Sequence, residues 1–261
     1  MNIFSLEGKC VTAFGGAGYL GIATVEAMLD LGAKVLIADR FPDYAKEYVA
    51  HLESNPACEL FPCNAGNVED IRAALDACEQ KFGKVTNVVN FIAYGPAGGS
   101  KPIESCDDET FQAGLEGSIN VMFRVLREAI PYLEKNESSS IVNTGSMYGI
   151  VSPDPGIYGT SGQNNPVYYG AGKAGVIQLT RYAAGHLAKR GIRVNCVTPG
   201  PFPDSRKLPP KEFLDELSKK TMLGRIGKNS EIAGAYCYLL SDAATFTTGA
   251  NIVVDGGWTA W

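Results

Sequence analysis

Several classes of protein are excluded by what this 261-residue sequence lacks. It holds only two histidines and no Cys-x-x-Cys pair, so ligands for a catalytic metal are scarce and we predict no metal site. It has no run of lysine or arginine and a formal net charge of -5, which argues against a nucleic-acid partner. No apolar run reaches the length of a membrane span, and the first residues lack the apolar core of a signal peptide. We therefore expect no membrane partner, and a cytoplasmic protein whose seven cysteines are reduced structural thiols.

Short β-branched runs alternate regularly with longer amphipathic segments along the chain. We predict strands over 10–14, 34–38, 58–62, 87–92, 140–145, 192–197 and 251–255. We predict helices over 19–31, 43–54, 69–82, 107–134, 167–190 and 230–241. This alternation predicts one α/β domain over residues 1–261, a Rossmann-like, doubly wound, seven-stranded parallel sheet with helices on both faces. Two turn-rich loops, 147–167 and 199–211, follow predicted strands, where such sheets bind their ligands.

The stretch VTAFGGAGYLG, residues 11–21, joins the first predicted strand to the first predicted helix. Gly15 permits a tight turn, Gly18 lets a phosphate approach the main chain, and Gly21 lets the helix pack close to the strand. The free N–H groups at the start of the helix, including those of Tyr19 and Leu20, attract an anion. We predict that this turn holds the pyrophosphate of a dinucleotide, the alternative being an ordinary tight turn.

The end of the second predicted strand indicates which dinucleotide it is. Asp39 lies where a carboxylate can accept both ribose hydroxyl groups of an adenosine. The same carboxylate would repel a 2′-phosphate, so we predict NAD as the cofactor. Arg40 could instead grip such a phosphate, stack on the adenine or remain a surface charge.

The segment YGAGK, residues 169–173, carries the predicted chemistry. Tyr169 and Lys173 are four residues apart on a predicted helix and so share one face, whereas Tyr168 has Gly172 at the equivalent position. A phenol is a poor base at neutral pH, but a neighbouring ammonium together with a cationic nicotinamide stabilises the phenolate and lowers its pKa. Such a tyrosine could take a proton from an alcohol while hydride leaves the same carbon. Taken alone, this spacing is a common coincidence.

Other motifs accompany this pair in a defined order. They are the glycine turn, Asn90 in VNFIA, Ser146 in IVNTGS, RVNCVTPG at 193–200 and DGGW at 255–258. In this order, from about Gly8 to Thr259, the sequence resembles the short-chain dehydrogenase/reductase family of the compact, single-domain type.

The resemblance implies roles for particular residues. In that family the serine positions the substrate oxygen, the tyrosine is the acid or base, and the lysine binds the nicotinamide ribose; here these are Ser146, Tyr169 and Lys173. The resemblance also implies cofactor contacts along the chain, at the ribose, the adenine and the nicotinamide, by Asn90, Asn64, Ala65, Pro199 and Phe202. It further implies a homodimer or homotetramer.

The sequence departs from the family pattern in the long central helix. Ser118 stands where the family usually has an asparagine that relays protons from the lysine, and Asn120 would point to another face. We include Ser118 among the catalytic residues and expect it to modulate the relay, since a helix serine can bond back to its own turn and perturb the helix. The family's asparagine-rich loop is reduced to NFIA, which keeps only Asn90. These departures favour, as an alternative, a catalytically weak dinucleotide-binding sensor or scaffold protein.

The segment between Ser146 and Tyr169 is longer than is common in the family. Its insertion, 153–167, is rich in neutral hydrogen-bonding groups suited to a polyhydroxylated ligand, namely Tyr158, Thr160, Ser161, Gln163, Asn164 and Asn165. A steroid or acyl chain would require an apolar wall instead. The insertion, PGPFPD and the GGW ending also resemble family members that act on sugars, sugar acids or sugar-derived precursors. We therefore predict an NAD-dependent oxidoreductase that interconverts a secondary alcohol and a ketone on a small polar substrate that is sugar-like, a polyol or a sugar acid.

The sequence also allows alternatives to this prediction. The insertion could pack on a neighbouring subunit, and the protein could be a 3-oxoacyl-type reductase. The glycine spacing also resembles nucleotide-sugar epimerases and dehydratases, but these need a large C-terminal domain for which no chain remains after Asp255. On the proline-rich loop, Arg206 or Lys207 could hold a carboxylate or phosphate, or be exposed.

Overall fold

The computed structural model describes residues 2–41, 43–96 and 102–261, and these contain one seven-stranded, all-parallel sheet of order β3-β2-β1-β4-β5-β6-β7. Its strands are β1 Cys10–Phe14, β2 Lys34–Asp39, β3 Cys58–Pro62, β4 Asn87–Asn90, β5 Ser139–Thr144, β6 Ile192–Pro199 and β7 Asn251–Val254. The Rossmann-like α/β fold predicted from the sequence is thereby confirmed, although β4 ends before the predicted residue 92 and β6 continues to Pro199.

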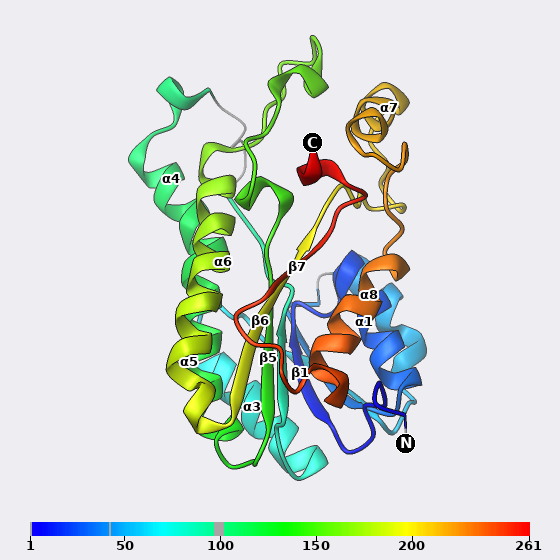
Figure 1. Cartoon of the computed structure of the whole chain (residues 1–261), viewed down its shortest axis with the longest axis vertical. Coiled ribbons are helices and arrows are strands. Elements are labelled where there is room, and N and C mark those ends of the chain that lie inside the picture. Colours follow the sequence, from blue (N-terminus) through cyan, green and yellow to red (C-terminus); the bar gives the residue numbers. More distant parts are fainter. Residues whose placement is uncertain (1, 42, 97–101) are drawn as a thin grey trace.

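Helices cover both faces of the sheet (Figure 1). Helices α1 Tyr19–Asp30 and α8 Ser230–Leu240 pack together on one face, and α3 Val68–Phe82, α5 Val121–Leu133 and α6 Val167–Leu187 lie on the other. Helix α2, Asp43–Val49, continues as a 3₁₀ turn over Ala50–Leu52, close to the predicted 43–54. Because helices cover both faces, the central strands read as continuous apolar runs, and every residue of β1 is buried.

Two helical regions differ from the sequence prediction. The predicted helix 107–134 is divided into α4 Asp108–Leu115, a π-helical turn Glu116–Asn120 and α5. Helix α7, Lys211–Lys220, was not predicted, because the prolines of 199–211 obscured the amphipathic pattern that follows them. Helix α7 lies beyond the carboxyl end of the sheet (Figure 1), and its Leu217 belongs to one buried apolar cluster with Trp258. Both departures lie beside the candidate site.

Candidate active site

The candidate site lies beyond the carboxyl ends of the strands, where the order of the sheet reverses between β1 and β4. In a doubly wound sheet this reversal opens a crevice that loops and helix N-termini surround. Both turn-rich loops of the sequence leave the sheet at this edge, after β5 and β6.

The glycine turn has the geometry that a phosphate site requires. Gly15 has a φ of 73°, in the left-handed region, and a side chain there would lie 3.1 Å from the backbone nitrogen of Ile92. A side chain at Gly21 would meet the carbonyl oxygen of Gly16 at 2.7 Å, so only glycine permits this approach of α1 to the turn. None of the described side chains caps the helix at Gly18, which leaves its first N–H groups for an anion.

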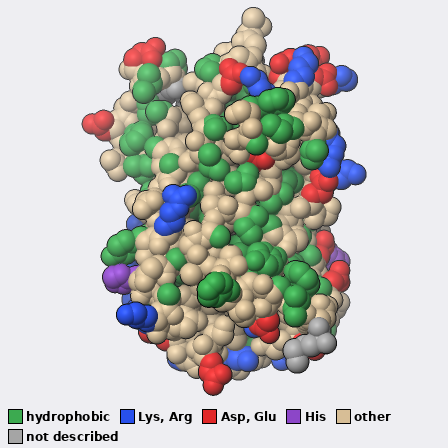
Figure 2. Space-filling view, in the orientation of Figure 1, with side chains coloured by type: hydrophobic (Ala, Val, Ile, Leu, Met, Phe, Trp, Pro, Cys, Tyr) green, Lys and Arg blue, Asp and Glu red, His purple; other side chains and the backbone are tan. Residues whose placement is uncertain are grey.

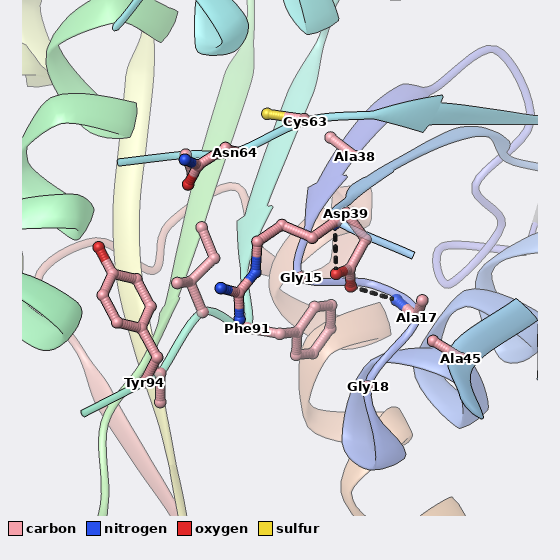
Figure 3. A pocket seen from close by; sticks show the side chains of 14 residues that line it. Gly15, Ala17, Gly18, Ala38, Asp39, Ala45, Cys63, Asn64, Phe91 and Tyr94 are labelled. Atoms are coloured by element: carbon pink, nitrogen blue, oxygen red, sulfur yellow. Dashed lines mark hydrogen bonds between the residues drawn. The ribbon is translucent and has the colours of Figure 1, made fainter. Parts of the chain in front are cut away.

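A cavity of about 160 Å³ adjoins this turn (Figure 3). The cavity brings together the sequence-predicted residues Gly15, Gly18, Asp39, Arg40, Asn64 and Ala65. The carboxylate of Asp39 is held in place, since Oδ2 accepts the Ala17 N–H at 3.0 Å and Oδ1 accepts the Arg40 N–H at 2.7 Å. A fixed carboxylate therefore stands at the cavity, where the second strand ends.

Asn90 lies beneath the site, in the sheet. It is fully buried, and its amide donates to Oδ1 of Asn143, its neighbour on β5, at 2.9 Å. Asn143 in turn donates to Oγ of Thr180 on α6 at 3.0 Å. The amide of Asn90 thus links β4 to the element that carries Tyr169 and Lys173, and does not line the adjoining cavity.

Ser146, Tyr169 and Lys173 come together at the end of β5. Ser146 follows the strand and Oγ accepts the N–H of Tyr148 at 3.2 Å, which fixes the serine side chain. The phenol of Tyr169 on α6 lies close enough to the Ser146 hydroxyl for the serine to lower its pKa. The ammonium of Lys173 lies 6.0 Å from the centre of the Tyr169 ring and donates to the carbonyl of Thr144 at 2.8 Å. The three side chains therefore converge at the end of β5.

Burial governs the proton affinities at this position. It lowers the pKa of Lys173, which is 1% exposed, to about 8. Burial also raises the pKa of Tyr169, and the Ser146 hydroxyl only partly opposes this rise. The expected lowering of the Tyr169 pKa includes the charge of a cationic nicotinamide. Among the protein groups alone, desolvation of the phenolate outweighs the other effects. Tyr169 holds its proton and is suited to donate it.

Ser118 lies against α6, the helix that carries Tyr169 and Lys173. Its hydroxyl donates to the carbonyl of Gly114 at 2.9 Å, as the sequence suggested for a helix serine, and the helix widens to a π turn here. A side chain at Gly172, beside Lys173, would overlap Ser118 Oγ, so the two helices meet at van der Waals distance. Asn120 is exposed and bonds to Glu116 at 3.1 Å, so it faces away from the site.

The segment after β6 folds back over the first helix. Pro199 ends β6 and is buried, and the ring of Phe202 packs on Gly227 away from the cavity of the glycine turn. The guanidinium of Arg206 lies 3.5 Å from the centre of the Tyr48 ring and 5.2 Å from that of Tyr19. It is therefore not a free surface charge.

An ion pair between Arg206 and Asp204 also fixes the segment after β6. Two nitrogens of the Arg206 guanidinium bond to the two carboxylate oxygens of Asp204, each at 2.7 Å. This bidentate pair and the two aromatic contacts tie the segment after β6 to the start of α1 and to α2. The glycine turn is thus covered from the side of Tyr19.

The insertion, α7 and Trp258 meet in an aromatic wall, which the sequence prediction missed. Tyr148 lies edge-on to Trp258 with ring centres 6.2 Å apart, and Tyr158 of the insertion stacks on Phe213 of α7 at 5.3 Å. Ile157, also of the insertion, is buried among these residues. The predicted polar insertion is therefore divided: Thr160, Ser161 and Gln163 form an exposed tip, whereas Tyr158, Asn164 and Asn165 are half-buried.

Comparison with known proteins identifies the family. A family model described as enoyl-(acyl carrier protein) reductase matches residues 16–259. A 3-oxoacyl-[acyl-carrier-protein] reductase of Thermotoga maritima is 34% identical over 257 residues, which cover 97% of this chain and 98% of that protein. The chain belongs to the short-chain dehydrogenase/reductase family. Members of this family are oxidoreductases that act on alcohol and carbonyl groups with a nicotinamide dinucleotide.

Two further members of the short-chain dehydrogenase/reductase family are similar over nearly the whole chain. A 2,5-dichloro-2,5-cyclohexadiene-1,4-diol dehydrogenase of Sphingobium indicum is 33% identical over 260 residues, covering 98% of each protein. The structure of a short-chain dehydrogenase from Leptospira borgpetersenii with bound NAD+ superposes with a TM-score of 0.84 at 28% identity, over 99% of this chain and 96% of that one.

The residues present fit the nicotinamide dinucleotide of the family. The evidence lies in this chain: a glycine cradle that side chains would fill, an uncapped helix start among the described residues, and the fixed carboxylate of Asp39 at the adjoining cavity. The sequence did not indicate the other lining residues, which include Cys63, Phe91 and Tyr94. Cys63 and Phe91 directly follow strands and Tyr94 lies three residues beyond Phe91, and only the fold brings them together.

In the described part of the chain, no helix combines the length and the apolar character needed to cross a membrane. The same residues contain no group of three or more histidine, cysteine, aspartate or glutamate side chains placed to hold a metal ion.

Proposed function

We propose that this short-chain dehydrogenase/reductase is NAD-dependent and interconverts a secondary alcohol and a ketone on a small, polar, polyol or sugar-like substrate. The observation that carries the proposal is the convergence of Ser146, Tyr169 and Lys173 at the end of β5, beside a dinucleotide cradle.

The geometry assigns a step to each of these side chains. The hydroxyls of Ser146 and Tyr169 bind the substrate oxygen, and Tyr169 takes the alcohol proton during oxidation or donates it during reduction. The ammonium of Lys173, held by Thr144, supplies the positive charge that stabilises the phenolate. Bound NAD supplies the hydride acceptor for the same substrate carbon.

The surroundings of Asp39 support NAD over NADP. Two backbone N–H groups hold its carboxylate at the cavity, so it cannot swing away from a 2′-phosphate without losing both hydrogen bonds. The guanidinium of Arg40 lies 5.7 Å from the centre of the Tyr94 ring, where it is placed to cover an adenine. The similarity to a family member with bound NAD+ points the same way.

A second candidate function is reduction of a 3-oxoacyl thioester. The 34% identical relative from Thermotoga maritima favours it, and so does the half-buried ring of Phe213 beside Tyr158. The polar groups of Tyr148, Tyr158 and Asn165 on the same side favour a hydroxylated substrate, as does the similarity to a diol dehydrogenase.

We also propose that the protein is a homodimer or homotetramer. Tyr182 on α6 is 66% exposed and Phe123 on α5 is 46% exposed. The edge strand β7 leaves Val253 exposed, and Figure 2 shows apolar side chains spread over this face, with charged groups mainly around its edges. Light scattering on the purified protein measures the assembly, and a monomer at micromolar concentration would contradict it.

The function is tested with two sets of substrates. Polyols, sugars and sugar acids are supplied with NAD or NADP, and a 3-oxoacyl thioester is supplied with NADH or NADPH. Formation or loss of reduced nicotinamide gives kcat/KM for every pair. We expect at least one polyol to reduce NAD with a kcat/KM at least about tenfold above that with NADP, a difference of about 1.4 kcal/mol. Turnover of the thioester with NADPH, without turnover of any polyol, would replace the proposed function by the second candidate.

A further inference from the structure

Tyr236, on α8, is a fully buried side chain that the proposed reaction does not use. Its hydroxyl lies 2.7 Å from Oγ1 of Thr144, the last residue of β5. The hydroxyl of Thr144 also bonds to the backbone carbonyl of Asn90, at the end of β4. Because a carbonyl only accepts, Thr144 gives its single proton to Asn90, and Tyr236 is the donor in the other bond. Burial raises the pKa of Tyr236, so the phenol keeps the proton that it donates.

The residue that Tyr236 holds is also the residue that holds Lys173. Among the described residues, the ammonium of Lys173 donates only to the backbone carbonyl of Thr144, at 2.8 Å. The side chain and the carbonyl of this one threonine therefore link α8, β4 and α6 at the end of β5. A displacement of Thr144 displaces the partner that fixes the ammonium beside the ring of Tyr169.

The ring and the hydroxyl of Tyr236 make separate contacts. The ring centre lies 4.9 Å from that of Phe91, which lines the cavity at the glycine turn. Tyr236→Phe keeps this ring contact and removes only the hydroxyl. The same helix offers a matched control, since the hydroxyl of Tyr238 lies 2.8 Å from Oγ1 of Thr247. Thr247 precedes β7, at the edge of the sheet opposite the candidate site.

We propose that Tyr236 is a positioning residue for Lys173. Its hydroxyl, acting through Thr144, fixes the carbonyl that holds the ammonium beside Tyr169. The inference rests on the proposed function, in which this ammonium stabilises the phenolate. Tyr236 itself touches neither Lys173 nor the reacting atoms in this account, and its effect passes through the two bonds of Thr144.

The expected kinetic signature is a fall in kcat at nearly constant KM for the alcohol. Oγ of Ser146 is held separately, by the N–H of Tyr148, so the substrate oxygen keeps this partner when Tyr236 is changed. A displaced ammonium acts on the charge that develops on the phenolate during the reaction. A purely structural bond would instead lower the stability of the fold and leave kcat of the folded enzyme unchanged.

The test measures kcat and KM per folded molecule, with NAD and the best alcohol of the substrate panel. Tyr236→Phe should lower kcat by about threefold to tenfold, the scale of one hydrogen bond, and keep KM for the alcohol within about twofold. Thr144→Val removes both hydroxyl bonds and should lower kcat at least as far, and adding Tyr236→Phe to it should cause no further loss. Thr144→Ser returns the hydroxyl and should recover at least half of the wild-type kcat. Tyr238→Phe is the control and should leave kcat within about twofold.

Three outcomes overturn the inference: a kcat of Tyr236→Phe within about twofold of the wild type, losses that multiply in the double variant, or an equal loss in Tyr238→Phe. If no compound in the panel is turned over, the proposed function has failed there, and urea unfolding replaces the rate. The shift of the unfolding midpoint caused by Tyr236→Phe should then be at least halved in a Lys173→Met background, while that of Tyr238→Phe is the same in both. Equal shifts for Tyr236→Phe in the two backgrounds overturn the inference.

Discussion

Replacing the buried lysine should make the protein more stable while it removes turnover. Lys173 is 1% exposed, and burial lowers its pKa from 10.5 to about 8. Each pKa unit corresponds to about 1.4 kcal/mol, so the protonated lysine costs the folded state about 3 kcal/mol relative to the unfolded chain. Lys173→Met keeps the shape of the stem and removes this cost, but leaves the carbonyl of Thr144 without one donor, a loss of about 1 kcal/mol. We expect a net gain of about 2 kcal/mol at pH 7.

The sign of the pH dependence follows from the same shift. Below pH 8 the folded and unfolded chains both carry the proton of Lys173, and the full cost is present. Between pH 8 and 10.5 the unfolded chain binds more protons than the folded one, so the wild type gains stability from this group as the pH rises. The advantage of Lys173→Met should therefore shrink over this range.

Urea unfolding of both proteins at pH 7, 8, 9 and 10 measures this difference. Other titrating groups affect both proteins alike and cancel when the two free energies of unfolding are subtracted. We expect the difference to fall by about 2 kcal/mol between pH 7 and 10. A difference that stays constant over this range, or a variant less stable than the wild type at pH 7, would refute the reasoning.

Three further predictions concern the contacts around the site. Gly172→Ala should destabilise the protein by about 1–3 kcal/mol, because the added methyl overlaps Ser118 Oγ. Ser118→Ala in the same chain should restore about 1 kcal/mol, and additive effects of the two substitutions in urea unfolding would contradict this contact. Asp39→Ala should lower the ratio of kcat/KM with NAD to that with NADP by at least about tenfold, and an unchanged ratio would remove Asp39 from cofactor selection. Arg206→Ala removes the contact with Tyr48 and should raise KM for NAD by about threefold to tenfold. If both KM and the NADH dissociation rate stay at wild-type values, Arg206 has no role in covering the glycine turn.

The parts of the structure that the sequence predicted are those with local causes. The strands follow from β-branched runs, and the glycine turn follows from backbone conformations that only glycine adopts freely, as at Gly15. Tyr169 and Lys173 meet because residues four apart share a helix face. Each of these features needs only neighbouring residues, so the sequence pattern was sufficient.

The parts that the sequence did not predict depend on distant residues. Arg206 finds Tyr19 and Tyr48 through folding of the segment after β6 over the first helix. The aromatic wall requires the insertion, α7 and Trp258 to meet. The rise of the Tyr169 pKa in the chain alone could not be predicted for the same reason, since desolvation is set by everything packed around the phenol.

The most direct test of the central claim is Tyr169→Phe, which removes one hydroxyl and keeps the ring. The account predicts that kcat/KM for the best alcohol falls by about a thousandfold, the range of general acid–base catalysis, while the dissociation constant for NADH stays within about twofold. Turnover at the wild-type rate in Tyr169→Phe, with the cofactor bound as before, would contradict it.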